Sequence, residues 1–313
     1  MNKQNVLNTA VLLITYKRLD TTTQVFEAIR KAKPRRLYIS SNSGKNDEEN
    51  ESVNKVREFL EQNIDWECKV DKLYRKAHLS AKLSISGAIT WFFDNEEQGI
   101  ILEDDCLPSQ SFFWFCEELL VRYKEDMRVW HIGGSSTLQD NILTNEYSYY
   151  FSKFNHIWGW ATWASRWGKY DINLSSLDEF TNGKYIENIS NDKLLQKFWL
   201  SNFRNVCEGR VDTWDYQWYY TTWTNGGGAI IPTTNLISNI GFGEGATHTS
   251  DVEHKLANMP AGNVDFDLVH PNIMMPNALY DKYNAKFLFD LNYFVFYKNK
   301  IKKLIKIIRK VKK

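Results

Sequence analysis

Residues 99–108 read Gly-Ile-Ile-Leu-Glu-Asp-Asp-Cys-Leu-Pro. A short apolar run ahead of three consecutive acidic residues is typical of a buried strand in a parallel sheet. Ligands of open α/β sheets bind beyond the carboxyl ends of such strands, where Glu103, Asp104 and Asp105 would lie. Three carboxylates repel one another unless a cation lies between them, and Mg²⁺ or Mn²⁺ prefers such oxygen ligands and often binds substrate phosphates as well. The alternative is an acidic turn that caps a helix beginning near Ser109.

The segments around this strand alternate between strand and helix patterns. We predict strands over residues 9–16, 36–40, 66–73, 99–102 and 128–134, and helices over residues 21–31, 48–63, 80–95 and 109–125. Such alternation predicts an α/β fold with a doubly wound, mostly parallel sheet and flanking helices. The first hundred residues contain neither a G-x-G-x-x-G nor a G-x-x-x-x-G-K-[ST] phosphate loop. A metal ion at the three acids would therefore hold the phosphates, which favours nucleotide-sugar chemistry over hydride or ATP phosphoryl transfer.

Composition and charge narrow the class of protein. The 313 residues are 43% hydrophobic, enough for a large core in one big domain or two small ones. Residues 298–313 hold nine Lys or Arg and no acid, so the other 30 basic and 38 acidic residues give the body a net charge of −8. Because nucleic-acid binding favours a basic body, we expect no nucleic-acid partner. Four scattered cysteines and an N-terminus without a signal-peptide pattern predict a cytoplasmic protein.

Four further segments follow one another around the acidic stretch: Tyr16-Lys17-Arg18, Trp158-Gly159-Trp160-Ala161-Thr162-Trp163, Trp214-Asp215-Tyr216-Gln217-Trp218 and residues 232–248. With Glu103-Asp104-Asp105 they resemble, in order and rough spacing, motifs of glycosyltransferases with the GT-A fold. The family is that of β-1,2-N-acetylglucosaminyltransferase I and its bacterial relatives. The resemblance covers residues 9–250. It implies a Rossmann-like GT-A fold and metal-dependent, inverting sugar transfer.

The resemblance also implies roles for single residues. Asp215 is the expected general base, in an aromatic frame that could exclude water. Asp105 is the expected direct ligand of Mn²⁺ or Mg²⁺, and His248 is expected beside the metal. The residues expected at the nucleotide-sugar donor are Thr15, Arg18, Asn42, Lys82, Glu103 and Asp104. The alternatives are that Asp215 pairs with Arg210, that His248 is structural and that Lys82 is a surface charge.

One departure from the family concerns the donor base. The family's second strand ends in Ser-x-Asp or Ser-Asp-Gly, with the Asp on uracil, whereas this chain reads Ser41-Asn42-Ser43-Gly44. The Asn42 amide still offers both a donor and an acceptor to a base. A UDP-sugar is therefore the expected donor.

Tryptophans 158, 160, 163 and 167 would lie on one side of a helix. Such a face suits the apolar side of a sugar ring, and the alternative is that these residues fill the core.

We predict a GT-A domain over residues 1–275, with a donor half over about 1–135 and an acceptor half over about 136–275. Residues 276–313 would form an aromatic and basic segment. Within it, residues 301, 304, 305, 308 and 311 are apolar at helical spacing among lysines. This pattern is typical of an amphipathic helix on an anionic membrane, and a helix packed on the body is the alternative.

The resemblance implies a glycosyltransferase of bacterial surface polysaccharide synthesis, and the basic segment places it on the inner face of the cell membrane as a peripheral protein. It would move a sugar from a nucleotide-diphosphate donor to a glycan or lipid-linked acceptor. Two other classes stay open. A glycoside hydrolase would place two acids across a cleft, and a carbohydrate- or membrane-binding protein could keep the fold without catalysis.

Overall fold

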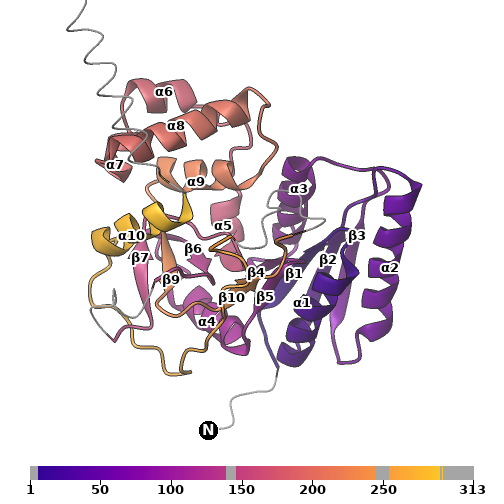
Figure 1. Ribbon diagram of the computed structural model, residues 1–313. Helices are drawn as coiled ribbons and strands as arrows, with labels where there is room; N and C mark the ends of the chain where they lie inside the picture. Colours follow the sequence, from indigo (N-terminus) through magenta and orange to yellow (C-terminus); the bar gives the residue numbers. More distant parts are fainter. Residues whose placement is uncertain (1–5, 139–145, 244–253, 290, 292–313) are drawn as a thin grey trace, which may run out of the picture.

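A computed structural model describes residues 6–138, 146–243, 254–289 and 291 (Figure 1). Its strands are β1 (Ala10–Thr15), β2 (Arg36–Ser41), β3 (Lys69–Tyr74), β4 (Gln98–Glu103), β5 (Cys106–Pro108), β6 (Val129–Gly133), β7 (Tyr149–Ser152), β8 (Trp160–Trp163), β9 (Gly228–Pro232) and β10 (Ile237–Asn239). Its helices are α1 (Leu19–Ala32), α2 (Asp47–Asn63), α3 (Ala81–Phe93), α4 (Gln110–Arg122), α5 (Ala164–Trp167), α6 (Leu177–Asn182), α7 (Ile186–Ile189), α8 (Lys193–Cys207), α9 (Asp215–Thr224) and α10 (Ala278–Leu288).

Eight strands form one sheet in the order β3-β2-β1-β4-β8-β6-β9-β7, and β5 pairs with β10 in a second, two-stranded sheet. The pairs β3–β2, β2–β1 and β1–β4 are parallel, and β8 runs antiparallel between β4 and β6. Helices flank the sheet (Figure 1). The expected α/β, Rossmann-like fold with a mostly parallel sheet is therefore confirmed.

Alternate residues of the central strands serve two different cores, because successive side chains of a strand point to opposite faces. Val11 and Leu13 of β1 belong to a core with residues of α1, α2 and α4. Leu12 of the same strand belongs to a second core with residues of α3 and several tryptophans. Burial on both faces explains why β1 reads as a continuous apolar run.

The tryptophan-rich segment is not the helix that we considered from the sequence. Trp160 and Trp163 lie on strand β8, and Trp167 ends the one-turn helix α5. Gly159 precedes the strand with a φ of +58°, a conformation that favours glycine. Because β8 is central, its tryptophans are shared between the cores, with Trp160 in one and Trp163 in the other.

Strand β3 begins at Lys69, three residues later than the apolar pattern predicts. Trp66 instead packs its ring against Phe26 at 5.9 Å and donates its indole N–H to the Pro34 carbonyl at 2.9 Å. In the sequence, a tryptophan that packs just before a strand can therefore be mistaken for the first residue of that strand.

Helices α6 to α9 gather above the sheet in Figure 1 and share a core of their own around Trp199. After this layer the chain returns to β9 and later places α10 against β7, where the Asn277 N–H donates to the Phe151 carbonyl at 2.8 Å. The predicted division at residue 275 and the basic helix over residues 298–313 stay predictions, and the latter lies outside the described residues. Within the described part, no helix has the length and apolar character needed to cross a bilayer.

Candidate active site

The three acids lie where the parallel strands end. Glu103 is the last residue of β4 and pairs in register with Ile14 of β1, while Thr15 pairs with Ser41 at the end of β2. These carboxyl ends form one edge of the sheet, the usual ligand edge of an open α/β fold. The sequence prediction of an acidic corner at this edge is confirmed by the placement of Glu103, Asp104 and Asp105. We use the name acidic corner for these three residues.

Arg18 binds two members of the acidic corner. Its Nη2 atom lies 2.6 Å from Asp105 Oδ2 and 3.0 Å from Asp104 Oδ1, and its Nη1 donates to the Gly241 carbonyl at 3.1 Å. The second oxygen of Asp104 accepts the Tyr16 N–H at 2.9 Å. Both oxygens of Asp104 are thus engaged, and this residue holds Arg18 and the end of β1 in place.

Burial and mutual repulsion perturb the acids of the corner. Burial, followed by repulsion from Asp105, raises the pKa of Asp104 to about 6, against the attraction of Arg18. Burial also raises the pKa of Glu103 well above its usual range, with further contributions from Asp105, Asp104 and Asp215. Asp215, from a distant element, is the last and smallest of these three contributions to the raised pKa of Glu103. A bound cation would relieve the repulsion.

Asp215 is the first residue of α9, and the Thr213 hydroxyl donates to its Oδ1 atom. The preceding Trp214 is buried and stacks on Trp160, with ring centroids 5.6 Å apart. The expected aromatic surroundings of Asp215 are therefore present. The guanidinium of Arg210 instead contacts Glu208 and Asn205 at an exposed position, so the alternative of an Asp215–Arg210 pair is not what the structure contains.

Asn42 is buried and fastens two loops together. Its Oδ1 accepts the N–H groups of Ser43 and Leu79 at 3.0 and 3.1 Å, and its Nδ2 donates to the Leu79 carbonyl at 2.9 Å. An aspartate could not donate to that carbonyl, which explains the amide at this position. A base could still accept the second amide hydrogen of Asn42, and its donor-binding role stays a prediction.

A polar cluster that the sequence analysis missed lies beside Asn42. Glu49 of α2 accepts the Tyr16 hydroxyl at 2.5 Å and pairs with Lys17 at 2.6 Å. Hydrogen bonds from Lys17 and Tyr16 lower the pKa of Glu49 to about 2. The Tyr16 ring lies 5.8 Å from that of His78, whose Nδ1 contacts the Ser43 carbonyl. The sequence gives no sign of this cluster, because Glu49 lies 33 positions after Tyr16.

For two other predicted donor residues, Thr15 and Lys82, the contacts below do not involve the acidic corner. The Thr15 side chain is buried and its hydroxyl donates to the Ser40 carbonyl at 3.4 Å. Lys82 is the second residue of α3, and the N–H groups of Ala81 and Lys82 donate to the Asp212 carboxylate at 2.9 and 3.2 Å. Asp212 thereby ties the segment before Asp215 to α3. The donor roles of Thr15 and Lys82 stay predictions.

Three of the four tryptophans considered for sugar contact are core residues. Trp160, Trp163 and Trp167 are buried, whereas Trp158 is only partly buried. The Trp158 ring meets Phe242 edge to face at 5.9 Å, one residue beyond Gly241. Trp158 is thus the member of the set that lies near the acidic corner.

The residue types of the acidic corner fit a hard divalent cation, since carboxylate oxygens are its preferred ligands. Among the described residues, Asp105 Oδ1 has only the weak thiol contact from Cys106 at 3.5 Å, whereas Oδ2 is bound by Arg18. In the described part of the chain, no group of three or more His, Cys, Asp or Glu side chains is arranged for metal binding. The second predicted metal residue, His248, lies outside that part.

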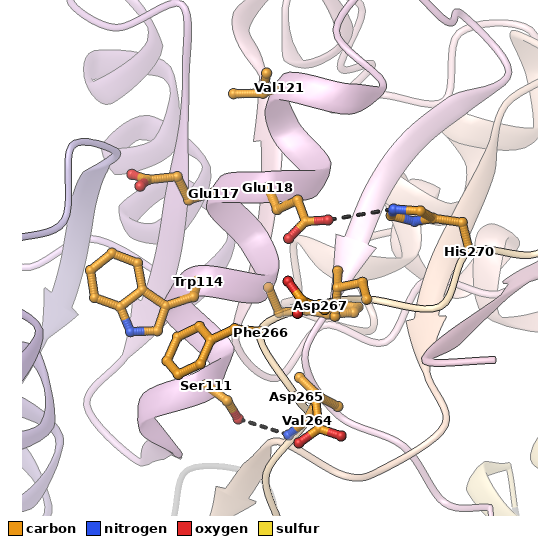
Figure 2. Close-up of a pocket in the computed structure, with 12 residues that line it drawn as sticks. Ser111, Trp114, Glu117, Glu118, Val121, Val264, Asp265, Phe266, Asp267 and His270 are labelled. Atoms are coloured by element: carbon orange, nitrogen blue, oxygen red, sulfur yellow. Dashed lines mark hydrogen bonds and ion pairs between the residues drawn. The ribbon is translucent and has the colours of Figure 1, made fainter. Parts of the chain in front are cut away.

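A separate cavity of about 780 Å³ lies between α4 and residues 264–270 (Figure 2). Glu118 and His270 contact each other across it at 3.5 Å, and the Val264 N–H donates to Ser111 Oγ at 3.2 Å. Its described lining combines aromatic and acidic side chains and includes neither the acidic corner nor Asp215. This cavity is therefore distinct from the candidate active site.

No protein-family model matches the chain, and no curated protein matches it. Among solved structures, HddC from Yersinia pseudotuberculosis is similar at 12% identity and a TM-score of 0.31, over 52% of this chain and 80% of that one. A UDP-glucose pyrophosphorylase complexed with UDP-glucose is similar at 12% identity and a TM-score of 0.29, over 51% and 78%. The 4-diphosphocytidyl-2C-methyl-D-erythritolsynthase from Anaerococcus prevotii DSM 20548 is similar at 11% and 0.30, over 65% and 84%. These values assign neither a family nor an activity to the chain, and its resemblance to β-1,2-N-acetylglucosaminyltransferase I stays a prediction.

Proposed function

We propose that this chain is a glycosyltransferase that moves a sugar from a UDP-sugar to a hydroxyl group of a glycan or lipid-linked acceptor. The observation that carries the proposal is that three neighbouring carboxylates and Arg18 gather at the ligand edge of the sheet. The acidic corner and Asp215 have different roles in this reaction. The acidic corner serves the departing nucleoside diphosphate, and Asp215 serves the attacking hydroxyl.

In this mechanism Asp215 accepts the proton of the acceptor hydroxyl while that oxygen bonds to the anomeric carbon. The bond from the anomeric carbon to the donor phosphate oxygen breaks on the opposite face, so the configuration inverts. The N-terminus of α9 favours the ionised carboxylate that the base requires. The hydrogen bond from Thr213 fixes the orientation of that carboxylate.

Asp105 is the described residue that would hold Mn²⁺ or Mg²⁺, with His248 as a second expected contact, and Glu103 would contact the donor. When bound, the cation neutralises the negative charge that grows on the departing diphosphate. Arg18 contributes a permanent positive charge at the same corner, because two carboxylates overcome the effect of its burial and raise its pKa. Asp104 orients Arg18 and is a positioning residue.

Attachment to the cytoplasmic face of the membrane belongs to the same proposal. Nine basic residues in 298–313 would bring the chain to an anionic leaflet. A lipid-linked acceptor of surface polysaccharide synthesis would be found there.

The test is UDP release from a panel of UDP-sugars with Mn²⁺, measured with and without sugar acceptors. We expect release that depends on one donor and on an acceptor. A glycoside hydrolase would instead cleave a glycoside without nucleotide, and a non-catalytic binder would bind donors without turnover. If no UDP-sugar binds in calorimetry with Mn²⁺ present, the proposed function is wrong.

A further inference from the structure

We infer that Arg18 occupies the cation position at Asp105 and competes with a divalent metal, and that the diphosphate of the nucleotide draws Arg18 away so that metal and nucleotide bind cooperatively. The competition follows from the contacts of Arg18 alone. The role of the diphosphate rests on the proposed function.

The first observation is the placement of the guanidinium. One nitrogen, Nη2, serves both Asp104 and Asp105, at 3.0 and 2.6 Å. The side chains are only 22% exposed for Arg18, 9% for Asp104 and 21% for Asp105, so solvent screens this attraction little. A divalent cation that takes Asp105 Oδ2 as a ligand must displace Arg18 from that atom. Two cations at one carboxylate oxygen also repel each other.

The second observation is how the site is closed around this oxygen. The Ile240 N–H donates to the Asp105 carbonyl at 2.9 Å, and the next residue, Gly241, accepts from Arg18 at 3.1 Å. A β-carbon at Gly241 would lie 2.1 Å from Asp105 Oδ2. Backbone therefore crowds one side of the oxygen and Arg18 covers another. Binding of a metal at Oδ2 therefore requires that Arg18 moves.

A diphosphate offers Arg18 a better partner than one carboxylate oxygen. Guanidinium groups bind phosphate oxygens with two parallel hydrogen bonds, and a diphosphate carries more than one negative charge. Arg18 is the residue before α1, at the carboxyl end of β1, which is the edge where the donor would lie. A diphosphate there would take the guanidinium and leave Asp105 to the metal. Each ligand would then increase the affinity for the other by the same factor.

The experiment measures Mn²⁺ binding by calorimetry, with no nucleotide and then with saturating UDP, in the wild type, Arg18→Met and Lys17→Met. Lys17→Met is the matched control, because it removes a neighbouring positive charge whose partner is Glu49. We expect Arg18→Met to bind Mn²⁺ alone about 5- to 150-fold more tightly than the wild type, the usual range of such couplings. Lys17→Met should match the wild type. UDP should tighten Mn²⁺ binding strongly in the wild type and little in Arg18→Met.

Equal Mn²⁺ affinity of the wild type and Arg18→Met without nucleotide would overturn the competition. If Arg18→Met does not fold, Arg18→Lys replaces it, since an ammonium keeps the charge without the planar fork and should weaken the competition. The wild type alone also tests the inference, because Mn²⁺ affinity independent of UDP contradicts it. If Arg18→Met gains Mn²⁺ affinity while no variant binds UDP, the competition holds and the proposed function fails.

Discussion

Gly241 lies so close to Asp105 that a β-carbon on the glycine would come within 2.1 Å of the Asp105 Oδ2 atom. The carbonyl of the same glycine accepts a hydrogen bond from Arg18, 223 residues away in the sequence. Three distant segments thus meet at one oxygen atom. Only glycine allows this approach, because the clash would be with the carboxylate itself.

The first prediction is that Gly241→Ala destabilises the protein and weakens its binding of UDP with Mn²⁺. The added methyl group must push the loop away from Asp105, and such overpacking typically costs about 1–3 kcal/mol. Denaturant unfolding and calorimetry measure the two effects. Gly262→Ala is the control, since its β-carbon would meet the Thr234 methyl group at 2.7 Å, away from the acidic corner. A Gly241→Ala protein with the stability and affinity of the wild type would show that the close approach has no role.

The second prediction separates Asp104 from Asp105. Asp104→Asn should lower the free energy of unfolding by about 3 kcal/mol, because it removes the charge paired with Arg18 and leaves one oxygen where both Arg18 and the Tyr16 N–H need an acceptor. Asp105→Asn should lower it less, since Asp105 is more exposed. Asp105→Asn should nevertheless abolish the Mn²⁺-dependent part of UDP binding. Calorimetry that finds this part unchanged in Asp105→Asn would remove Asp105 from the metal assignment.

The third prediction concerns pH and Asp281 of α10. Burial raises the pKa of Asp281 to about 6, against hydrogen bonds from the Ser152 hydroxyl and the Lys153 N–H. Because the folded state holds this proton more tightly than the unfolded state, stability should fall as the pH rises from about 4 to about 6. The loss should reach about 3 kcal/mol and then stay constant at higher pH.

Urea unfolding of the wild type and Asp281→Asn between pH 4 and pH 7 checks this prediction. The difference in unfolding free energy between the two proteins should change by that amount, because the variant lacks the titrating group. If the unfolding free energies of the two proteins differ by the same amount at every pH in this range, Asp281 is ionised as easily in the folded protein as in the unfolded chain.

Local pattern was enough to predict the sheet and its acidic edge. The apolar run of β4 and the turn after Glu103 are both local signals, and parallel strands bring Thr15 and Glu103 to one edge. The secondary structure of the Trp160 segment is harder to predict, because bulky aromatic residues are found in a central strand as readily as on a helix face. Its placement depends on pairing with β4, to which β8 is antiparallel.

The contacts that shape the site could not be predicted from the sequence. Arg18 and Asp105 are 87 residues apart, and neither residue type indicates that they form an ion pair. The sequence pattern predicts that Asn42 meets the donor base, whereas in the fold its amide binds the Leu79 backbone. The role of such a side chain depends on which loop the fold places beside it, and the hydrophobic pattern of the sequence does not show which loops meet.

The fourth prediction is that removal of residues 298–313 releases the protein from anionic vesicles and leaves transfer to a soluble acceptor largely intact. Each basic residue near such a surface contributes about 1 kcal/mol, and the body has a formal net charge of −8 that would not hold it there. Binding of the full chain should weaken steeply with salt. Vesicle sedimentation measures both effects, with neutral vesicles as the control. Equal sedimentation of the full and shortened chains would contradict the membrane role.

The last prediction is that Asp215→Asn keeps donor affinity and stability but lowers turnover by a factor of about 10² to 10⁴, the usual contribution of a positioned general base. The amide retains the size of the side chain and can still accept the Thr213 hydroxyl, but it cannot take a proton at neutral pH. A buried pair with Arg210 would have predicted a loss of about 3–5 kcal/mol on the same change. Arg210 lies at an exposed position beside Glu208, so we expect no such loss. Thr213→Ala is a graded control, because it removes the orienting hydrogen bond and leaves the carboxylate, and its turnover should fall less. An Asp215→Asn protein with near-normal turnover per folded molecule would rule out Asp215 as the base.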